Sequence, residues 1–153
     1  MKKSILSFVF VLALATVASA APRFGVIGEQ AGGLGAFITD DMFNAQVTFS
    51  NTSDNASQKN EYSSIKVGAN YKIALDSVTA LTAGVNYLTT SGKKTGKNIE
   101  KDNTLAISAG FERALSSNIV LTTQADLYSQ KEEDTTKTTN LFSNGRVGVA
   151  YLF

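Results

Sequence analysis

The side chains that most often carry catalysis or bind transition metals are absent from this sequence. The 153 residues include no histidine and no cysteine. A serine nucleophile needs a base such as histidine to take its proton, and without imidazole or thiolate only carboxylates remain as metal ligands. The adjacent acids Asp40 and Asp41 are explained more simply by a turn, in which such side chains bond their own backbone. The sequence therefore predicts no enzyme activity, no metal site and no cofactor.

Two other patterns suggest binding chemistry. The glycines between Gly25 and Gly35 resemble a phosphate-binding loop, but the strand–loop–helix context and the Lys-Ser/Thr ending are missing, so tight packing explains them better. A lysine-rich segment over 91–102 could bind lipopolysaccharide phosphates or another polyanion through salt-sensitive contacts. The simpler reading, which we favour, is a solvated loop. The lysines concerned are Lys93, Lys94, Lys97 and Lys101.

The first twenty residues have the features of an export signal. An apolar run follows Lys2 and Lys3 and ends at small residues that suit a signal peptidase. A membrane anchor would need about 20 apolar residues. We therefore expect a signal peptide over 1–20, cleaved after about Ala20, and a single domain over 21–153.

The charge of the domain points to no polyanionic partner. With Lys2 and Lys3 set apart from the 14 basic residues of the chain, the remainder nearly balances the 13 acidic ones. No net field would attract nucleic acid or an acidic substrate. No apolar run beyond residue 21 is long enough for a helical span, whereas a strand of a membrane barrel needs only every second residue to be apolar.

Alternation of apolar and polar residues dominates the domain and predicts strands. From Ile65 to Ile73 the odd positions are apolar or aromatic, and the even ones are Lys, Gly, Asn and Lys. Tight turns alternate with polar connections over 54–60, 91–102 and 131–139, although the first such connection, around Gly32-Gly33, is short. The predicted strands cover 22–31, 33–39, 42–53, 61–74, 78–90, 103–114, 118–130 and 140–153.

Eight strands joined in this way predict an all-β fold, an antiparallel up-and-down transmembrane β-barrel. Tight turns would lie on the periplasmic side, together with both termini, because the number of strands is even. The hairpin around 67–77 matches that around 107–117 at a constant spacing of 40 residues. This echo is consistent with a meander of similar hairpins.

Periodicity alone does not say which face lies inside, because a soluble ligand-binding barrel also alternates. Three features favour an apolar exterior. The polar face is rich in small polar residues that suit a narrow lumen, aromatic residues gather near both strand ends as in interfacial girdles, and the inward charges balance. Against this pattern, Tyr62, Tyr128 and Phe142 have the wrong parity, so either bulges intervene or these residues lie above the bilayer.

Six charged residues are predicted to form a lumen network. Two acids and two bases share one depth, and one pair lies nearer the periplasmic mouth. Unpaired buried charges cost several kcal/mol, so we expect pairing, with Glu29–Arg146 as the direct contact unless barrel shear shifts the partners. The network comprises Glu29, Lys66, Asp126 and Arg146 at the first level and Lys72 and Glu112 at the second.

The last strand carries a more specific pattern. Val147, Val149, Tyr151 and Phe153 alternate with other residues up to the chain end. A terminal strand of this kind resembles the assembly signal of bacterial outer-membrane barrels, and with eight strands the chain resembles the small OmpA/OmpX-like superfamily. The resemblance implies an outer-membrane location, contact with its lipids and lipopolysaccharide, and recognition by the barrel assembly machinery. A peptidoglycan-binding domain, found in larger OmpA-type proteins, is not expected.

The expected function is a structural or surface-interaction role, such as membrane integrity or adhesion, for a barrel with a filled lumen. The alternative is a narrow diffusion pore, which would require the lumen network to open. A soluble periplasmic ligand-binding barrel is a third interpretation. The sequence does not identify a surface ligand or host partner.

Overall fold

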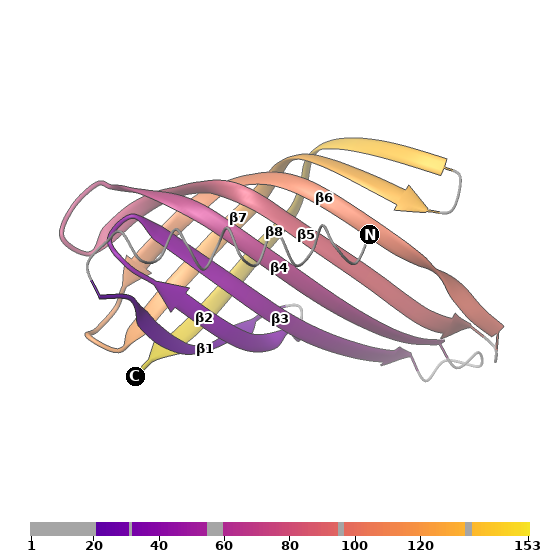
Figure 1. The fold of residues 1–153 in the computed structure, drawn as a ribbon, viewed down its shortest axis with the longest axis horizontal. Helices are drawn as coiled ribbons and strands as arrows, with labels where there is room; N and C mark the ends of the chain where they lie inside the picture. Colours follow the sequence, from indigo (N-terminus) through magenta and orange to yellow (C-terminus); the bar gives the residue numbers. More distant parts are fainter. Residues whose placement is uncertain (1–20, 31, 55–59, 95–96, 134–135) are drawn as a thin grey trace.

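Eight antiparallel strands form a single closed barrel in sequence order (Figure 1). The computed structural model describes residues 21–30, 32–54, 60–94, 97–133 and 136–153, so the predicted signal peptide lies outside it. Within these residues, no helix is long and apolar enough to cross a membrane. The strands are β1 (Arg23–Glu29), β2 (Leu34–Thr39), β3 (Phe43–Asp54), β4 (Asn60–Ala74), β5 (Thr79–Lys94), β6 (Lys97–Ala114), β7 (Ile119–Glu133) and β8 (Thr136–Leu152).

The predicted eight-stranded antiparallel barrel is confirmed, and the strand bounds agree closely at the end that carries the tight turns. This tight-turn end, with the C-terminus, lies on the left of Figure 1. At the opposite end, which we call the hairpin end, strands β3 to β8 run on as long hairpins. The hydrogen bonds of the tight turns and of the hairpin extensions explain both features.

The tight turns share one hydrogen-bond scheme. The Asp40 Oδ1 accepts from the backbone N–H groups two and three residues later, both at 2.7 Å. Asp76 Oδ1 does the same at 2.8 and 2.7 Å, and Ser116 Oγ at 3.3 and 3.1 Å. The N–H of Val78 is the main cause that holds the pKa of the Asp76 carboxyl below its ordinary value. The turn predicted at Asp40-Asp41 is therefore present.

The long polar connections predicted over 91–102 and 131–139 are largely strand, which corrects those assignments. Strand β5 continues to Lys94 and β6 begins at Lys97, while only two residues separate β7 from β8. A backbone ladder needs no apolar side chains, and threonine favours strands. A polar cross-strand contact, the ion pair between Lys131 and Asp102 at 2.9 Å, reinforces the extensions of β6 and β7.

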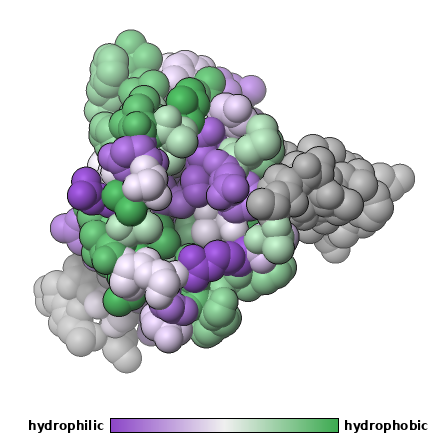
Figure 2. All heavy atoms as spheres, turned by 90° about the vertical axis from the view of Figure 1, so that its left-hand side faces the viewer, coloured by the Kyte–Doolittle hydropathy of each residue, from purple (hydrophilic) through white to green (hydrophobic). Residues whose placement is uncertain are grey.

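The barrel carries its apolar side chains on the outside, as the alternation predicted. Val47, Ile107 and Val149 are each about half exposed, whereas Lys66 and Asp126 on the opposite face are buried. Seen from the tight-turn end, hydrophilic groups gather toward the middle and hydrophobic ones lie mostly around them (Figure 2). This polarity is the reverse of a soluble ligand-binding barrel.

A bulge resolves the parity of Tyr128. Leu127 is the extra residue in the β6–β7 register, and the β7–β8 register shifts nearby, between Ala125 and Asp126. Tyr128 therefore pairs with Ile107 and Leu141 and faces outward. Phe142, next to this irregularity, is exposed and has a positive φ of 49°. The β4 registers run without a bulge past Tyr62, which keeps its inward parity.

The apolar outer face predicts that the cost of introducing a charged side chain there depends on its depth in the bilayer. We expect Val47→Arg to destabilise the barrel in lipid vesicles by about 2–4 kcal/mol, because the substitution places a charge in the middle of the apolar band. Asn51→Arg is the matched control, on the same strand and face but beyond the last apolar residue, and should cost far less. Equal urea-unfolding midpoints for the two variants would contradict the assignment of this face.

Candidate functional site

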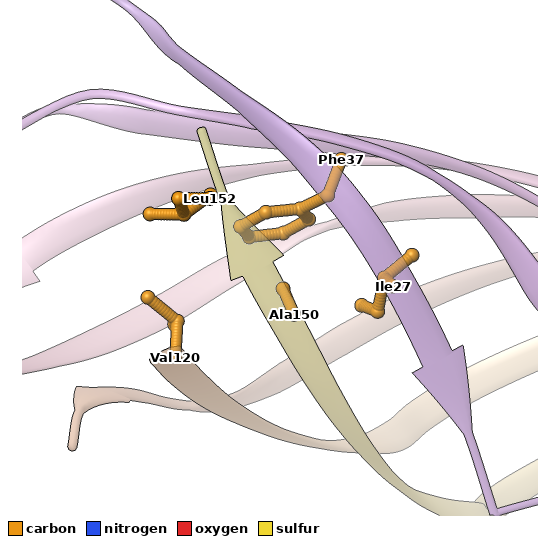
Figure 3. Close-up of a cluster of buried hydrophobic side chains, with 5 residues drawn as sticks. All are labelled: Ile27, Phe37, Val120, Ala150 and Leu152. Atoms are coloured by element: carbon orange, nitrogen blue, oxygen red, sulfur yellow. The ribbon is translucent and has the colours of Figure 1, made fainter. Parts of the chain in front are cut away.

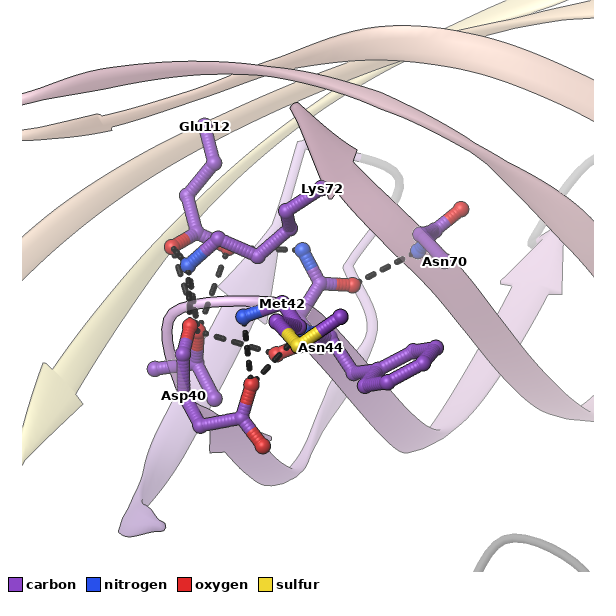
Figure 4. Close-up of polar contacts among 8 residues, drawn as sticks. Asp40, Met42, Asn44, Asn70, Lys72 and Glu112 are labelled. Atoms are coloured by element: carbon purple, nitrogen blue, oxygen red, sulfur yellow. Dashed lines mark hydrogen bonds and ion pairs between the residues drawn. The ribbon is translucent and has the colours of Figure 1, made fainter. Parts of the chain in front are cut away.

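The lumen near the tight-turn end is held by a buried ion pair. Lys72 Nζ bonds Glu112 Oε1, and both side chains are about nine-tenths buried. Thr39 Oγ1 donates to the same carboxylate at 3.1 Å, and Lys72 also donates to the Asp40 carbonyl at 2.6 Å. Figure 4 shows the side chains of Lys72 and Glu112 converging from different strands near Asp40. A buried pair is tolerated when additional hydrogen bonds satisfy its remaining sites, which is the case here.

A chain of side-chain amides extends this pair across the lumen. The Gln124 amide donates to Asn70 Oδ1 at 2.8 Å, Asn70 donates to Asn44 Oδ1 at 2.7 Å, and Asn44 donates to Glu112 Oε2 at 2.6 Å. All donors point toward the carboxylate, so the hydrogen bonds of the chain polarise one another and stabilise its negative charge from strands β3, β4 and β7. We call this set, together with Lys72, the lumen plug.

The other four predicted charges lie together farther toward the hairpin end, but not in the pairing expected. Lys66 bonds Glu29 across the lumen, and Arg146 bonds Asp126 on the neighbouring strand. The predicted direct contact between Glu29 and Arg146 is therefore wrong. Glu29 also accepts hydrogen bonds from the side chains of Gln46 at 3.2 Å and Thr48 at 3.3 Å. Each acid thus has one base, and the level is neutral overall.

Part of the lumen is apolar, which the sequence reasoning missed. Beside the polar groups, five residues from β1, β2, β7 and β8 form a buried cluster (Figure 3). The signal was a set of unbroken apolar stretches, such as Ala36–Ile38 and Ala150–Phe153, in which both faces of the strand are hydrophobic. The cluster consists of Ile27, Phe37, Val120, Ala150 and Leu152.

The remaining predicted sites lie on the exterior or outside the described side chains. Val147, Val149, Tyr151 and Phe153 all point outward and are exposed. The backbones of the lysine-rich segment belong to β5 and β6, but its side chains, those of Lys93, Lys94, Lys97 and Lys101, lie outside the described residues. Polyanion binding by them stays a prediction.

The described side chains of the lumen fill the interior of the barrel and neutralise one another's charges. Within the described residues, no group of three His, Cys, Asp or Glu side chains is placed to hold a metal ion. A cavity of about 350 Å³ opens at the tight-turn end, where Thr39, Lys72, Glu112 and Leu152 are among its lining residues. The cavity thus meets the lumen plug and the apolar cluster. The arrangement is suited to closing a barrel.

The lumen plug yields a double-mutant prediction. Lys72→Met leaves Glu112 buried without its cation, and we expect a loss of about 3–5 kcal/mol of stability, measured by unfolding in urea. Adding Glu112→Gln should recover most of that loss, because the amide carries no charge and still accepts from Asn44. A double variant as unstable as Lys72→Met alone would show that the pair is not coupled.

Comparison with known proteins finds similar folds among solved structures. No family model matches the sequence, and none of the curated proteins matches it. Among solved structures, Neisserial surface protein A is 15% identical with a TM-score of 0.55, over 86% of this chain and 94% of that chain. The N-terminal β-barrel domain of Pseudomonas aeruginosa OprF is 13% identical with a TM-score of 0.48, over 86% and 96%. The attachment invasion locus protein Ail of Yersinia pestis is 13% identical with a TM-score of 0.46, over 86% and 95%. The similarity to Neisserial surface protein A shows that this chain shares the fold of that protein, which here is a closed barrel of eight antiparallel strands.

Proposed function

We propose that the protein is an outer-membrane barrel with a structural or surface-interaction role. The observation that carries this proposal is a lumen filled by interlocked side chains inside a wall whose exterior is apolar. Such a barrel is a rigid support that displays its long hairpins on one side of the membrane. Membrane integrity and adhesion are both roles that need a displayed surface rather than a passage.

The apolar exterior supports a location among lipids. Exposed large hydrophobic residues occur on every strand, including Phe24, Leu34, Ile65 and Tyr151. A continuous apolar surface of this extent would not remain in water as a monomer. Export through a cleaved signal over 1–20 and contact with outer-membrane lipids and lipopolysaccharide belong to this proposal.

A narrow diffusion pore is the second candidate. It is favoured by the cluster of opposite charges at one level and by the cavities that enter from the tight-turn end and beside Arg146. Against it stands the lumen plug, in which the almost fully buried Asn44 and Asn70 bond each other between neighbouring strands and bond Glu112 and Gln124 across the barrel. Opening a path would break several bonds among buried polar groups, each of which is costly to leave unmade.

Planar-bilayer conductance separates the two candidates. The purified barrel should insert without giving steady open channels, because the lumen plug blocks the axis. Arg146→Ala should not create such channels, since it leaves the Gln124–Asn70–Asn44–Glu112 chain intact. Steady channels from the wild type that widen in Arg146→Ala would establish the pore instead.

The terminal strand generates a prediction about assembly. We propose that the barrel assembly machinery recognises Val147, Val149, Tyr151 and Phe153. Their outward position on β8 and directly after it supports this proposal. Tyr151→Asp or deletion of Phe153 should strongly reduce the amount of barrel in the outer membrane. The matched substitutions Tyr151→Phe and Phe153→Tyr keep an aromatic ring and should assemble normally. Wild-type levels of both disruptive variants, measured by fractionation and by gel mobility with and without boiling, would refute this role.

A further inference from the structure

The first hairpin is too short to complete the barrel wall. Strands β1 and β2 contain 7 and 6 residues, whereas the other strands contain 12 to 18. A strand that crosses the hydrocarbon layer needs about 9–11 residues. The wall formed by β1 and β2 therefore ends within the depth of the apolar band, on the side that faces the hairpin end.

Two strand edges are left open above this hairpin. The β1–β8 ladder ends at Glu29↔Gly148, followed by one bond from the Gln30 N–H to the Val147 carbonyl at 2.9 Å. The β2–β3 ladder ends at Leu34↔Phe49. Beyond these points, the described residues of β8 pair only with β7, and those of β3 only with β4. Unpaired backbone at hydrocarbon depth is unfavourable, so the opening calls for a polar occupant.

A cavity lies at this opening. It has a volume of about 340 Å³ and is lined by Glu29, Gln30, Gly145 and Arg146. We call it the wall notch. One acid and one base line it, and each retains bonding capacity. Arg146 uses one nitrogen for Asp126 while its Nη1 is buried without a partner among the described residues.

The Glu29 carboxylate also has room for one more donor. It accepts from Lys66, Gln46 and Thr48, and a carboxylate offers about four acceptor positions. A ligand that presented both an anion and an ammonium group would meet a complementary charge at each end. An anion alone would leave the neutral level with an uncompensated negative charge.

The flanks of the wall notch are among the most exposed apolar positions of the barrel. Leu34 is 68% exposed on one side, and Leu141 and Phe142 are 68% and 82% exposed on the other. Phe142 is held at a φ of 49°, a conformation that a bulky residue rarely adopts and that tends to mark functional positions. These side chains offer surface for acyl chains on β2 and β8, the strands that border the opening.

We infer that the wall notch binds the zwitterionic headgroup of a phospholipid of the phosphoethanolamine class. Arg146 donates to the phosphate, Glu29 accepts from the ammonium group, and the acyl chains lie along Leu34, Leu141 and Phe142. The headgroup supplies hydrogen-bond partners to the open strand edges, where the short hairpin leaves the wall incomplete. This inference rests on the proposed membrane location but adds a specific lipid site to it.

Native mass spectrometry from nanodiscs tests the inference. The discs contain phosphatidylcholine with a minority of phosphatidylethanolamine or of phosphatidylglycerol. The wild type should retain one phosphatidylethanolamine in preference to the other two lipids. Phe142→Ser and Arg146→Lys should lose most of this retention, the second because lysine keeps the charge but not the forked donors. Leu105→Ser, at another exposed apolar position on β6 away from the wall notch, is the control and should behave like the wild type.

The outcomes are distinguishable. Equal retention of all three lipids, or unchanged retention in Phe142→Ser and Arg146→Lys, would mean that only general lipid contact exists and would overturn the inference. Binding of inorganic phosphate alone, with loss of retained lipid, would assign the notch to a free anion instead. Each variant is first checked by gel mobility without boiling. A folded barrel that retains no lipid defeats this inference alone, whereas failure of the wild type to insert defeats the proposed function as well.

Discussion

The backbone of this barrel has to satisfy its own hydrogen bonds, because hydrocarbon offers neither donors nor acceptors. Closure of the sheet through the β1–β8 ladder meets that requirement over the lower part of the wall. Once the ring is closed, each strand has one face toward lipid and one toward the axis, and the side-chain pattern has to follow. The apolar exterior, the small polar residues inside and the tight turns at one end are all consequences of this closure.

Closure also dictates the chemistry of the lumen. Charges that are removed from water need partners, and the six lumen charges form three ion pairs with no base left over. Hydrogen bonds from Thr39, Asn44 and Gln46 complete the carboxylates of two of these pairs. The interior is thus organised to be neutral and filled, which suits a support rather than a passage. Where closure is incomplete, at the wall notch, the same requirement calls for an external polar group.

The alternation of residues such as Ile65 to Ile73 was enough to predict the strands and their number, because a two-residue period is the period of a strand. The outward face could be predicted only with the small polar residues, the aromatic girdles and the balanced inward charges. Contacts across the lumen were not predictable in the same way. The pairing of Glu29 with Lys66 joins strands that are not neighbours, and the pairing of Arg146 with Asp126 spans a register shift between Ala125 and Asp126 on β7. The hairpin extensions were missed because their polar side chains carry no burial signal, although backbone pairing needs none. The apolar cluster around Phe37 was missed because strict alternation was assumed for every strand.

Magnetisation transfer from lipid acyl chains to protein methyl groups tests the inside-out polarity most directly. The unmodified barrel would be folded in bilayer nanodiscs with labelled Val, Leu and Ile methyls. The account predicts strong transfer to outward residues such as Val47, Ile107 and Val149, and none to the inward Ile27, Val120 and Leu152, which serve as internal controls of equal hydrophobicity. Transfer to the second group, or water contact at the first, would contradict it.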